Sequence, residues 1–395
     1  MSTIRLGTAS PGTQSTTAAT IALIDSIARR AASSKIDILL LPEAFIGGYP
    51  RGSSFGCAIG GRSDEGREEF AKYFDQAIDL GDNVGPGGGG AGVKWVKRQL
   101  NDDDTVRGDG SREELERIAR DTGVFIVTGC IEKTGGSLYC SVVYVCPKEG
   151  MLGKRRKVLP TGSERLVWAQ GAPSTLKAVS TTIRGIRINL AAAICWENYM
   201  PLLRQTLYSQ NINLYLAPTA DNRDAWLGLM RTVGVEGRCF VVSSNMAVPK
   251  DPVDVSNSTR SPVRGRRNST MTEEGFEIAL PRSPQRLHRR KSVFDDDGNE
   301  IILCKETKET QTPVFTSTIP EKTEWVSRGG SSIVTPFGDV VAGPQWEDPD
   351  GLIFADVDFR NCIRGRLDLD AAGSYSRNDS FRLSVEGLDL DPLPY

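Results

Sequence analysis

The sequence predicts an α/β layered fold built around one hydrophobic core. Between residues 36 and 245, apolar runs with the length of buried strands alternate with stretches of helical periodicity. The chain has 395 residues, enough for one large domain or two ordinary ones. Its hydrophobic content of 39% and charged content of 25% are typical of a globular protein that folds in water.

Composition excludes several classes of protein. The net charge of −2 predicts neither a nucleic-acid partner nor a membrane partner, and no apolar run has the length of a bilayer span. The first residues, MSTIRLGTASPG, lack a signal-peptide core. None of the eight cysteines forms a CxxC pair, so we expect no metal site of that kind. Several cysteines lie inside apolar runs, which predicts reduced thiols and a cytoplasmic protein.

The first half of the chain supplies two strands and a helix before its first reactive candidate. Residues 4–8 form a short apolar strand, and residues 36–41, IDILLL, form a buried one. Residues 17–33 form an amphipathic helix between them. Its apolar face consists of Ile21, Ile24, Ile27, Ala28 and Ala31. The glycine-rich residues 47–61 lack the Lys-Ser/Thr ending of a phosphate loop, so they give only a weak indication of nucleotide binding.

The elements that follow come from shorter patterns. Ser111 and Glu114 have the spacing of a capping box, which predicts that a helix begins at Ser111. Turn residues at 133–136 predict a hairpin. The expected order is a helix at 65–80, a glycine linker at 81–92, a helix at 111–121, and paired strands at 124–130 and 138–146.

The second half continues the alternation after residue 186. Apolar runs predict strands, and Gly338 predicts the turn of a hairpin. The expected elements are a strand at 186–194, a helix from about 199, a strand at 212–217, a helix at 224–236, a strand at 239–245, a hairpin at 331–341, a strand at 352–357 and a short helix at 361–367.

Residues 251–324 differ from the rest of the chain. They are rich in Ser, Thr, Pro, Arg and Asp and have almost no hydrophobic periodicity. Such a segment buries too little apolar surface to offset its ordering entropy, so we predict a largely disordered insertion. Ser269 and Ser292 follow basic residues in patterns typical of phosphorylation sites, although patterns this short often occur by chance.

Cys195 is the first candidate for chemistry. It follows the buried strand directly, at the carboxyl end of a sheet, where α/β proteins place reactive groups. A helix start nearby would favour the thiolate. The alternative is a core cysteine that packs as a small hydrophobe. The chain has a single histidine, His288, in a basic stretch, so the base for a nucleophilic Cys195 is expected to be a carboxylate.

Two further regions carry candidate partners for this thiol. Glu43 follows the strand at 36–41, and a buried carboxylate there must be paired or have a raised pKa. The alternative is a solvated loop residue. Residues 153–171 begin with a basic run, which is typical of a solvated face or an anion-binding patch. Pro160 and Gly162 break regular structure there, so Lys157 and Glu164 belong to an irregular loop that can fold over a site.

Taken together, these stretches resemble the nitrilase superfamily, and within it the nitrilase branch. The matching motifs are LPEAFIGGYPRG at 41–52, GKRRKVLPTGSERLVW at 153–168 and CWENYMPL at 195–202. LAPTAD at 216–221, EGRCF at 236–240 and RGRLDLD at 364–370 match in the same order. The resemblance implies an α/β fold, the four-layer-forming αββα sandwich of the nitrilase type, which pairs with a second copy. It also implies a carbon-nitrogen hydrolase domain at 1–360, interrupted at 251–324, and an extended arm at 361–395.

The resemblance also implies roles for individual residues. Cys195 would be the nucleophile, Glu43 the general base, Lys157 the electrostatic stabiliser and Glu164 a positioning residue. The substrate would be a small nitrile, with no metal or cofactor, and the protein would form a homodimer or larger homo-oligomer. Plain core packing is the alternative for the aromatic members of the expected substrate-binding set. That set is Tyr49, Trp168, Trp196, Asn198, Tyr199 and Thr219.

The implied reaction converts a nitrile to a carboxylic acid and ammonia through a thioimidate and a thioester on Cys195. Amide hydrolysis or nitrile hydration by the same site, and a catalytically idle scaffold, remain as alternatives. Aliphatic, arylaliphatic and cyanoamino-acid nitriles are all compatible with the sequence. Thr232 and residues 373–378 depart from the family pattern, as does the insertion, in regions that shape the pocket rim and subunit contacts in relatives.

Overall fold

The computed structural model describes residues 3–83, 93–250 and 323–395, together with the backbone of four short strands between 251 and 322. The chain divides into two compact units, residues 1–250 with 325–395, and residues 251–324. In the second unit the described strands form two antiparallel hairpins, β11 (Ser269–Met271) with β12 (Glu277–Ala279) and β13 (Ser292–Phe294) with β14 (Glu300–Ile302). The predicted disorder of the insertion, most of the predicted glycine linker, and His288 lie outside the described residues.

The first unit contains two sheets. The first is six-stranded, in the order β17-β1-β2-β3-β4-β5, with parallel pairing from β1 to β3 and antiparallel pairing elsewhere. The apolar runs of the sequence account for its central strands. The bounds are β1 (Ile4–Ala9), β2 (Ile38–Leu40), β3 (Phe125–Thr134), β4 (Ser137–Cys146), β5 (Gly150–Arg156) and β17 (Leu352–Val357).

The second sheet is seven-stranded and runs β10-β15-β9-β8-β7-β6, with β16 also paired to β15. Its centre, β7-β8-β9, is parallel, so the carboxyl ends of these three strands meet at one edge. The bounds are β6 (Val179–Ile183), β7 (Ile186–Ala192), β8 (Leu214–Thr219), β9 (Phe240–Asn245), β10 (Ala247–Pro249), β15 (Trp325–Val334) and β16 (Val340–Trp346).

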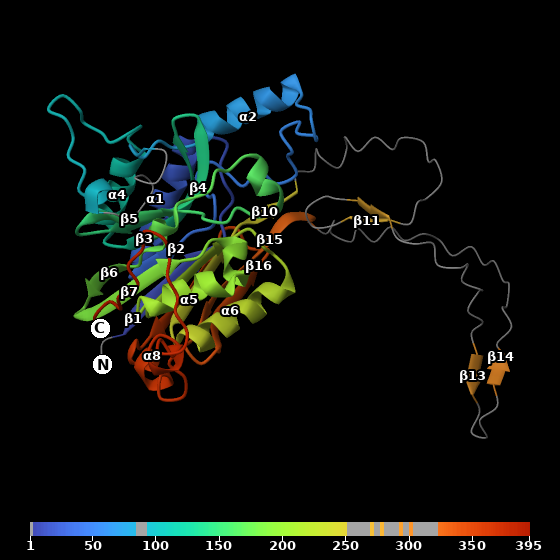
Figure 1. The fold of residues 1–395 in the computed structure, drawn as a ribbon. Helices are drawn as coiled ribbons and strands as arrows, with labels where there is room; N and C mark the ends of the chain where they lie inside the picture. Colours follow the sequence, from blue (N-terminus) through green and yellow to red (C-terminus); the bar gives the residue numbers. More distant parts are fainter. Residues whose placement is uncertain are drawn as a thin grey trace. The chain divides into compact units, whose positions relative to one another are not determined.

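Helices cover the outer face of each sheet. Helices α1 and α4 pack on the first sheet, and α5 and α6 pack on the second (Figure 1). This gives four layers, α, β, β and α, and the sequence prediction of an αββα sandwich is confirmed. The helices are α1 (Thr17–Ser33), α2 (Asp64–Gln76), α3 (Val93–Val96), α4 (Ser111–Thr122), α5 (Pro201–Ser209), α6 (Asp224–Gly237) and α8 (Arg360–Gly365). None of the described helices is long and apolar enough to cross a membrane.

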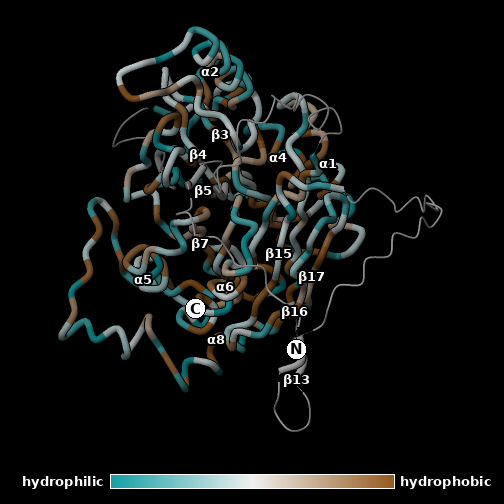
Figure 2. The backbone as a smooth tube through the Cα atoms, turned by 90° about the vertical axis from the view of Figure 1, so that its right-hand side faces the viewer, coloured by the Kyte–Doolittle hydropathy of each residue, from teal (hydrophilic) through white to brown (hydrophobic). Residues whose placement is uncertain are grey.

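Burial follows the predicted patterns closely. All five residues of the apolar face predicted for α1 are buried, and the helix has the predicted bounds. The apolar face of α1 packs on the outer face of the first sheet. A separate hydrophobic core fills the space between the two sheets, where Leu6, Ile38, Val127 and Leu190 meet. Helix α2 differs, since only Gly66 is buried, and Figure 2 shows it mostly in the hydrophilic colour. The buried residues thus lie where the sequence periodicity predicted them.

Two local predictions are wrong. The capping box does not form, because Gly110 caps α4 in a left-handed conformation and Glu114 instead pairs with Arg117. The basic run at the start of 153–171 is not a solvated face. Lys154, Arg155 and Arg156 belong to strand β5 and are at most 1% exposed, because buried carboxylates on neighbouring elements pair with them. Charge composition alone did not reveal those partners.

The C-terminal arm lies against the same chain. Leu393 donates its backbone N–H to the carbonyl of Gln210, and Asn211 donates its side-chain amide to the carbonyl of Leu393. Asn189 on β7 likewise donates to the carbonyl of Pro394. These bonds fix the end of the arm beside the loop that follows α5.

Candidate active site

Cys195 lies in a tight turn of the chain. Strand β7 ends at Ala192, and a short 3₁₀ helix runs from Cys195 to Tyr199. Cys195 has φ of +53°, a left-handed conformation that costs a residue with a Cβ about 1–2 kcal/mol. Asn198 holds the turn, because its amide nitrogen donates to the carbonyls of Ala193 and Cys195 at 2.9 and 2.7 Å. The strained conformation is therefore fixed by buried hydrogen bonds.

Glu197 connects this turn to the loop that carries Lys157. One carboxylate oxygen accepts from the backbone N–H of Ile194 at 2.8 Å. The other accepts from the N–H of Val158 at 2.7 Å and from the guanidinium of Arg155 at 2.6 Å. The sequence analysis missed Glu197 and Arg155, although both lie inside the motifs it quoted. Their role depends on a contact between segments about 40 residues apart, which no local pattern reveals.

Glu43 lies in the loop after β2 and is fully buried, which excludes the solvated-loop alternative. The loop folds onto β3 at Gly129, whose N–H donates to the carbonyl of Pro42 at 3.1 Å. A Cβ at Gly129 would lie 2.3 Å from that carbonyl oxygen, so only glycine allows this approach. Ala44 turns the chain with φ of +51°. The close backbone contact directs the Glu43 side chain between the sheets.

Lys157 lies directly after β5 and binds two carboxylates. Its ammonium is 2.8 Å from Glu43 and 2.7 Å from Glu164. Glu164 is held by the 3₁₀ helix Gly162–Leu166, because its carboxylate accepts from the N–H of Thr161 at 2.7 Å. The structure therefore brings together the four residues that the sequence motifs nominated. The ligand atoms of Glu43, Glu164 and Cys195 lie within 4.8 Å of one another.

Burial dominates the electrostatics of this group. It raises the pKa of Glu43, a shift that the charge of Lys157 opposes and that of Glu164 reinforces. Burial and the carboxylate of Glu43 also raise the pKa of the Cys195 thiol. The neighbouring carboxylates outweigh burial at Lys157 and raise the pKa of its ammonium well above its usual value. A helix start near Cys195 would favour the thiolate, but burial and Glu43 raise the pKa of the thiol, so it needs a base to react.

The cluster of two carboxylates and a thiol has the donor types of a metal site. However, the ammonium of Lys157 lies between the carboxylates and satisfies both of them. A divalent cation there would be repelled by that charge at about 3 Å. The donor set therefore fits a protonated lysine and not a metal ion.

Aromatic rings enclose the lysine. The Tyr49 hydroxyl donates to Glu164 at 3.0 Å, and its ring meets Trp168 edge to face at 5.5 Å. The ammonium of Lys157 lies 5.5 Å from the centre of the Trp168 ring. Tyr73, which the sequence analysis did not single out, accepts from the indole of Trp168 at 3.1 Å. These rings keep water away from the charged group and strengthen its interactions.

The remaining predicted substrate-binding residues lie around the thiol. Thr219, at the end of β8, donates to the Cys195 sulfur at 3.3 Å. The Trp196 indole donates to Asp221 at 2.9 Å, and Tyr199 is 38% exposed beside it. Asn198 lies beneath the turn, where its oxygen accepts from the hydroxyl of Tyr215. Both the nitrogen and the oxygen of the Asn198 amide are therefore already hydrogen-bonded to the backbone and the core.

Comparison with known proteins assigns the chain to a family. Residues 3–366 match the model of the carbon-nitrogen hydrolase family. The chain belongs to this family. A nitrilase from Bradyrhizobium diazoefficiens is 35% identical over 363 residues, which cover 91% of this chain and 85% of the relative. An arylacetonitrilase from Trametes versicolor is 35% identical over 88% of this chain and 85% of its own length.

A solved structure supports the same fold. An amidase of the nitrilase superfamily from Nesterenkonia sp. AN1 aligns with a TM-score of 0.52 and 16% identity. The alignment covers 93% of this chain and 95% of the amidase. This likeness shows that the carbon-nitrogen hydrolase chain has the fold of the superfamily.

Proposed function

We propose that this carbon-nitrogen hydrolase is a nitrilase, which converts an organic nitrile to the carboxylic acid and ammonia. The observation that carries the proposal is the buried group of Cys195, Glu43, Lys157 and Glu164 at the carboxyl ends of the strands. Relatives named as nitrilases, at 35% identity over most of the chain, support the nitrile as the substrate class.

In this mechanism Glu43 takes the proton of the Cys195 thiol as the sulfur attacks the nitrile carbon. The raised pKa of Glu43 makes its carboxylate a stronger base than an ordinary glutamate. One oxygen of Glu43 binds Lys157, while the other is buried without a hydrogen-bond partner in the described structure. That second oxygen is the acceptor available to the thiol proton.

Attack forms a C–S bond and leaves negative charge on the nitrile nitrogen. Lys157 stabilises this charge in a site that the aromatic rings keep dry, and protonation of the nitrogen gives a thioimidate. Water then adds to the carbon to form a tetrahedral intermediate. Loss of ammonia gives a thioester, and a second water releases the acid and restores the thiol. Glu164 positions Lys157 throughout. These steps use only side chains of this chain and water, without a metal or organic cofactor.

The state of the cysteines bears on the cellular location of the enzyme. All seven cysteines in the described part of the chain are free thiols, which supports a reducing, cytoplasmic location. The substrate is a small molecule. We assign the catalytic domain to residues 1–360, with the interruption at 251–324, and the arm to 361–395.

The test of this function is ammonia release by the full chain and by Cys195→Ala and Cys195→Ser. Both substitutions should abolish turnover, because a serine hydroxyl has a far higher pKa than a thiol and Glu43 is too weak a base to compensate. Circular dichroism should show both variants folded. Ammonia release by Cys195→Ala above a few per cent of the parent rate would refute the role of Cys195.

We also propose that the protein self-associates, at least into a dimer. Exposed apolar side chains support this, since Leu202 after the thiol turn is 72% exposed and Leu367 after α8 is 89% exposed. Light scattering at micromolar concentration should give at least twice the chain mass of 43.0 kDa. A monomer under those conditions would contradict the proposal.

A further inference from the structure

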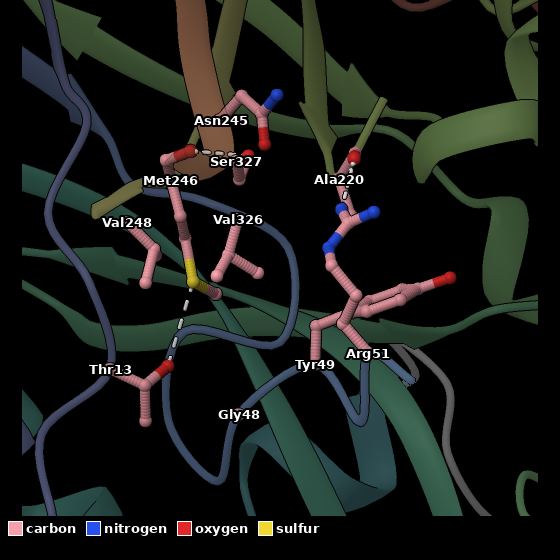
Figure 3. Close-up of a pocket in the computed structure, with 10 residues that line it drawn as sticks. All are labelled: Thr13, Gly48, Tyr49, Arg51, Ala220, Asn245, Met246, Val248, Val326 and Ser327. Atoms are coloured by element: carbon pink, nitrogen blue, oxygen red, sulfur yellow. Dashed lines mark hydrogen bonds between the residues drawn. The ribbon is translucent and has the colours of Figure 1, made fainter. Parts of the chain in front are cut away.

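A cavity of about 170 Å³ lies beside the proposed active site (Figure 3). Two of its lining residues connect it to the reactive groups. Tyr49 donates its hydroxyl to Glu164, and Ala220 follows Thr219, which contacts the Cys195 sulfur. Met246, Val248 and Val326 form an apolar wall. The cavity is therefore placed to hold the part of a substrate that is not undergoing chemistry.

Strand geometry limits the length of such a substrate. Cys195 follows β7 by three residues, and Asn245, which lines the cavity, ends β9. Since β8 separates these two parallel strands, their carboxyl ends are roughly 10 Å apart. A short nitrile can span this distance with its far end in the cavity.

Asn245 presents an unpaired acceptor to this cavity. Its amide nitrogen donates to the carbonyls of Asp221 and Gly329 at 3.0 and 2.7 Å. Carbonyls only accept hydrogen bonds, so these contacts fix which side of the amide is nitrogen. The oxygen has no hydrogen-bond partner in the described structure, although the residue is only 1% exposed. Figure 3 shows this oxygen turned toward the other lining residues and the nitrogen turned away.

Arg51 supplies the only charge among the residues that line the cavity. Its guanidinium donates to the carbonyl of Ala220 at 2.6 Å and lies 5.3 Å from the centre of the Tyr49 ring. No carboxylate of the described residues forms an ion pair with it. By contrast, the hydroxyls of Thr13 and Ser327 already donate to backbone carbonyls. Arg51 thus retains unused donors and Asn245 an unused acceptor, whereas the hydroxyl protons of Thr13 and Ser327 are already donated.

We propose that this cavity binds the polar end of a short nitrile that carries a carboxylate and an amino group on the same carbon, that is, a cyano-substituted α-amino acid. Arg51 binds the carboxylate, and the oxygen of Asn245 accepts a hydrogen bond from the ammonium. The proposal rests on the nitrilase function and selects one of the three substrate classes that the sequence left open. A neutral aliphatic or aromatic nitrile would cover both polar groups without pairing them, which is unfavourable.

The first experiment compares three nitriles of similar length with the full chain. The probes are β-cyanoalanine, its desamino analogue β-cyanopropionate, and butyronitrile, which lacks both charges. Each lost contact to a charged group should lower kcat/KM by roughly 10- to 100-fold, so the order should follow the number of charged groups. Equal or higher kcat/KM for butyronitrile would overturn the proposal. Equal values for β-cyanoalanine and β-cyanopropionate would remove Asn245 from it.

The second experiment uses Arg51→Gln with Arg62→Gln as the matched control. Arg62 is exposed and also donates to backbone carbonyls, but it does not line the cavity. Arg51→Gln should reduce the preference for β-cyanopropionate over butyronitrile by roughly 10- to 100-fold, and Arg51→Lys should restore part of it. An unchanged preference in Arg51→Gln, or the same change in Arg62→Gln, would contradict the assignment.

Binding to the Cys195→Ala protein separates this proposal from the nitrilase function. Calorimetry should show that β-cyanoalanine binds and that adding Arg51→Gln weakens binding. If no nitrile releases ammonia but this Arg51-dependent binding remains, the function fails and the subsite stands. If butyronitrile is hydrolysed while β-cyanoalanine neither reacts nor binds, the function stands and the subsite is refuted.

Discussion

Two buried ion clusters in this enzyme arise from four consecutive basic residues. Lys154 and Arg156 point to one face of β5, where both bind the carboxylates of Glu132 and Asp82. Lys157, just beyond the strand, points to the other face and binds Glu43 and Glu164. Because side chains alternate along a strand, one short sequence serves both faces of the sheet.

The two clusters differ in their balance of charge. At Glu132 burial alone would raise the pKa, but the charges of Lys154 and Arg156 outweigh burial and lower the pKa to about 2. At Glu43 a single ammonium is shared with a second carboxylate, and burial raises the pKa. A balanced cluster stabilises its ionised form, whereas an unbalanced one holds a carboxylate ready to take a proton. The first is suited to structure and the second to chemistry.

Exchanging each carboxylate for its amide should separate these roles. Glu43→Gln should lower kcat by roughly 10²- to 10⁴-fold, because the amide cannot accept the thiol proton. Its stability should change little, since Lys157 keeps Glu164. Glu132→Gln should instead destabilise the protein by roughly 3–5 kcal/mol, because Asp82 alone then faces the two buried cations Lys154 and Arg156. Urea unfolding and ammonia release measure the two effects, and the reverse assignment of losses would refute the comparison.

Acid should affect the two clusters at different pH. The lowered pKa of Glu132 contributes stability that is present above the pKa of an unfolded glutamate and is lost as pH falls from about 5 to about 2. Activity requires ionised Glu43, whose pKa is raised, so activity should be lost at a higher pH than an ordinary glutamate near 4.3 would dictate. Parallel profiles of kcat/KM and unfolding free energy test this. Activity that persists until the protein unfolds would argue against Glu43 as the base.

The smallest expected effect concerns the product. At the tetrahedral intermediate either ammonia or the thiolate leaves, and ammonia leaves when its nitrogen is protonated. Glu43, having taken a proton from the attacking water, is the donor, and Glu164 positions it through Lys157. The parent should therefore release mainly acid, and Glu164→Gln should raise the amide fraction several-fold while slowing turnover.

Chromatography of the products measures this ratio, with the exposed Glu149→Gln as a control for loss of a carboxylate. Amide as the main product of the parent would identify a nitrile-hydrating enzyme. An unchanged acid-to-amide ratio in Glu164→Gln would remove Glu164 from the mechanism.

Local sequence signals were enough to predict the layers of this fold and to select the candidate reactive residues. Period-3.6 patterns gave α1 and α6, and apolar runs gave the central strands, because both signals are local and strong. The three motifs nominated Glu43, Lys157 and Cys195 because they resemble a family in which such residues recur in this order. No contact between the segments had to be known.

The tertiary structure set the surroundings of these residues. It buried the basic run of β5, since Glu132 and Glu197 arrive from other elements to pair with it. It raised the pKa of the Cys195 thiol, through burial and the nearby carboxylate of Glu43. It also left the oxygen of Asn245 without a hydrogen-bond partner among the described residues, in a residue that lines the same cavity as Arg51. Desolvation and ion pairing depend on the distances between segments that are remote in sequence, and these distances exist only once the two sheets have packed.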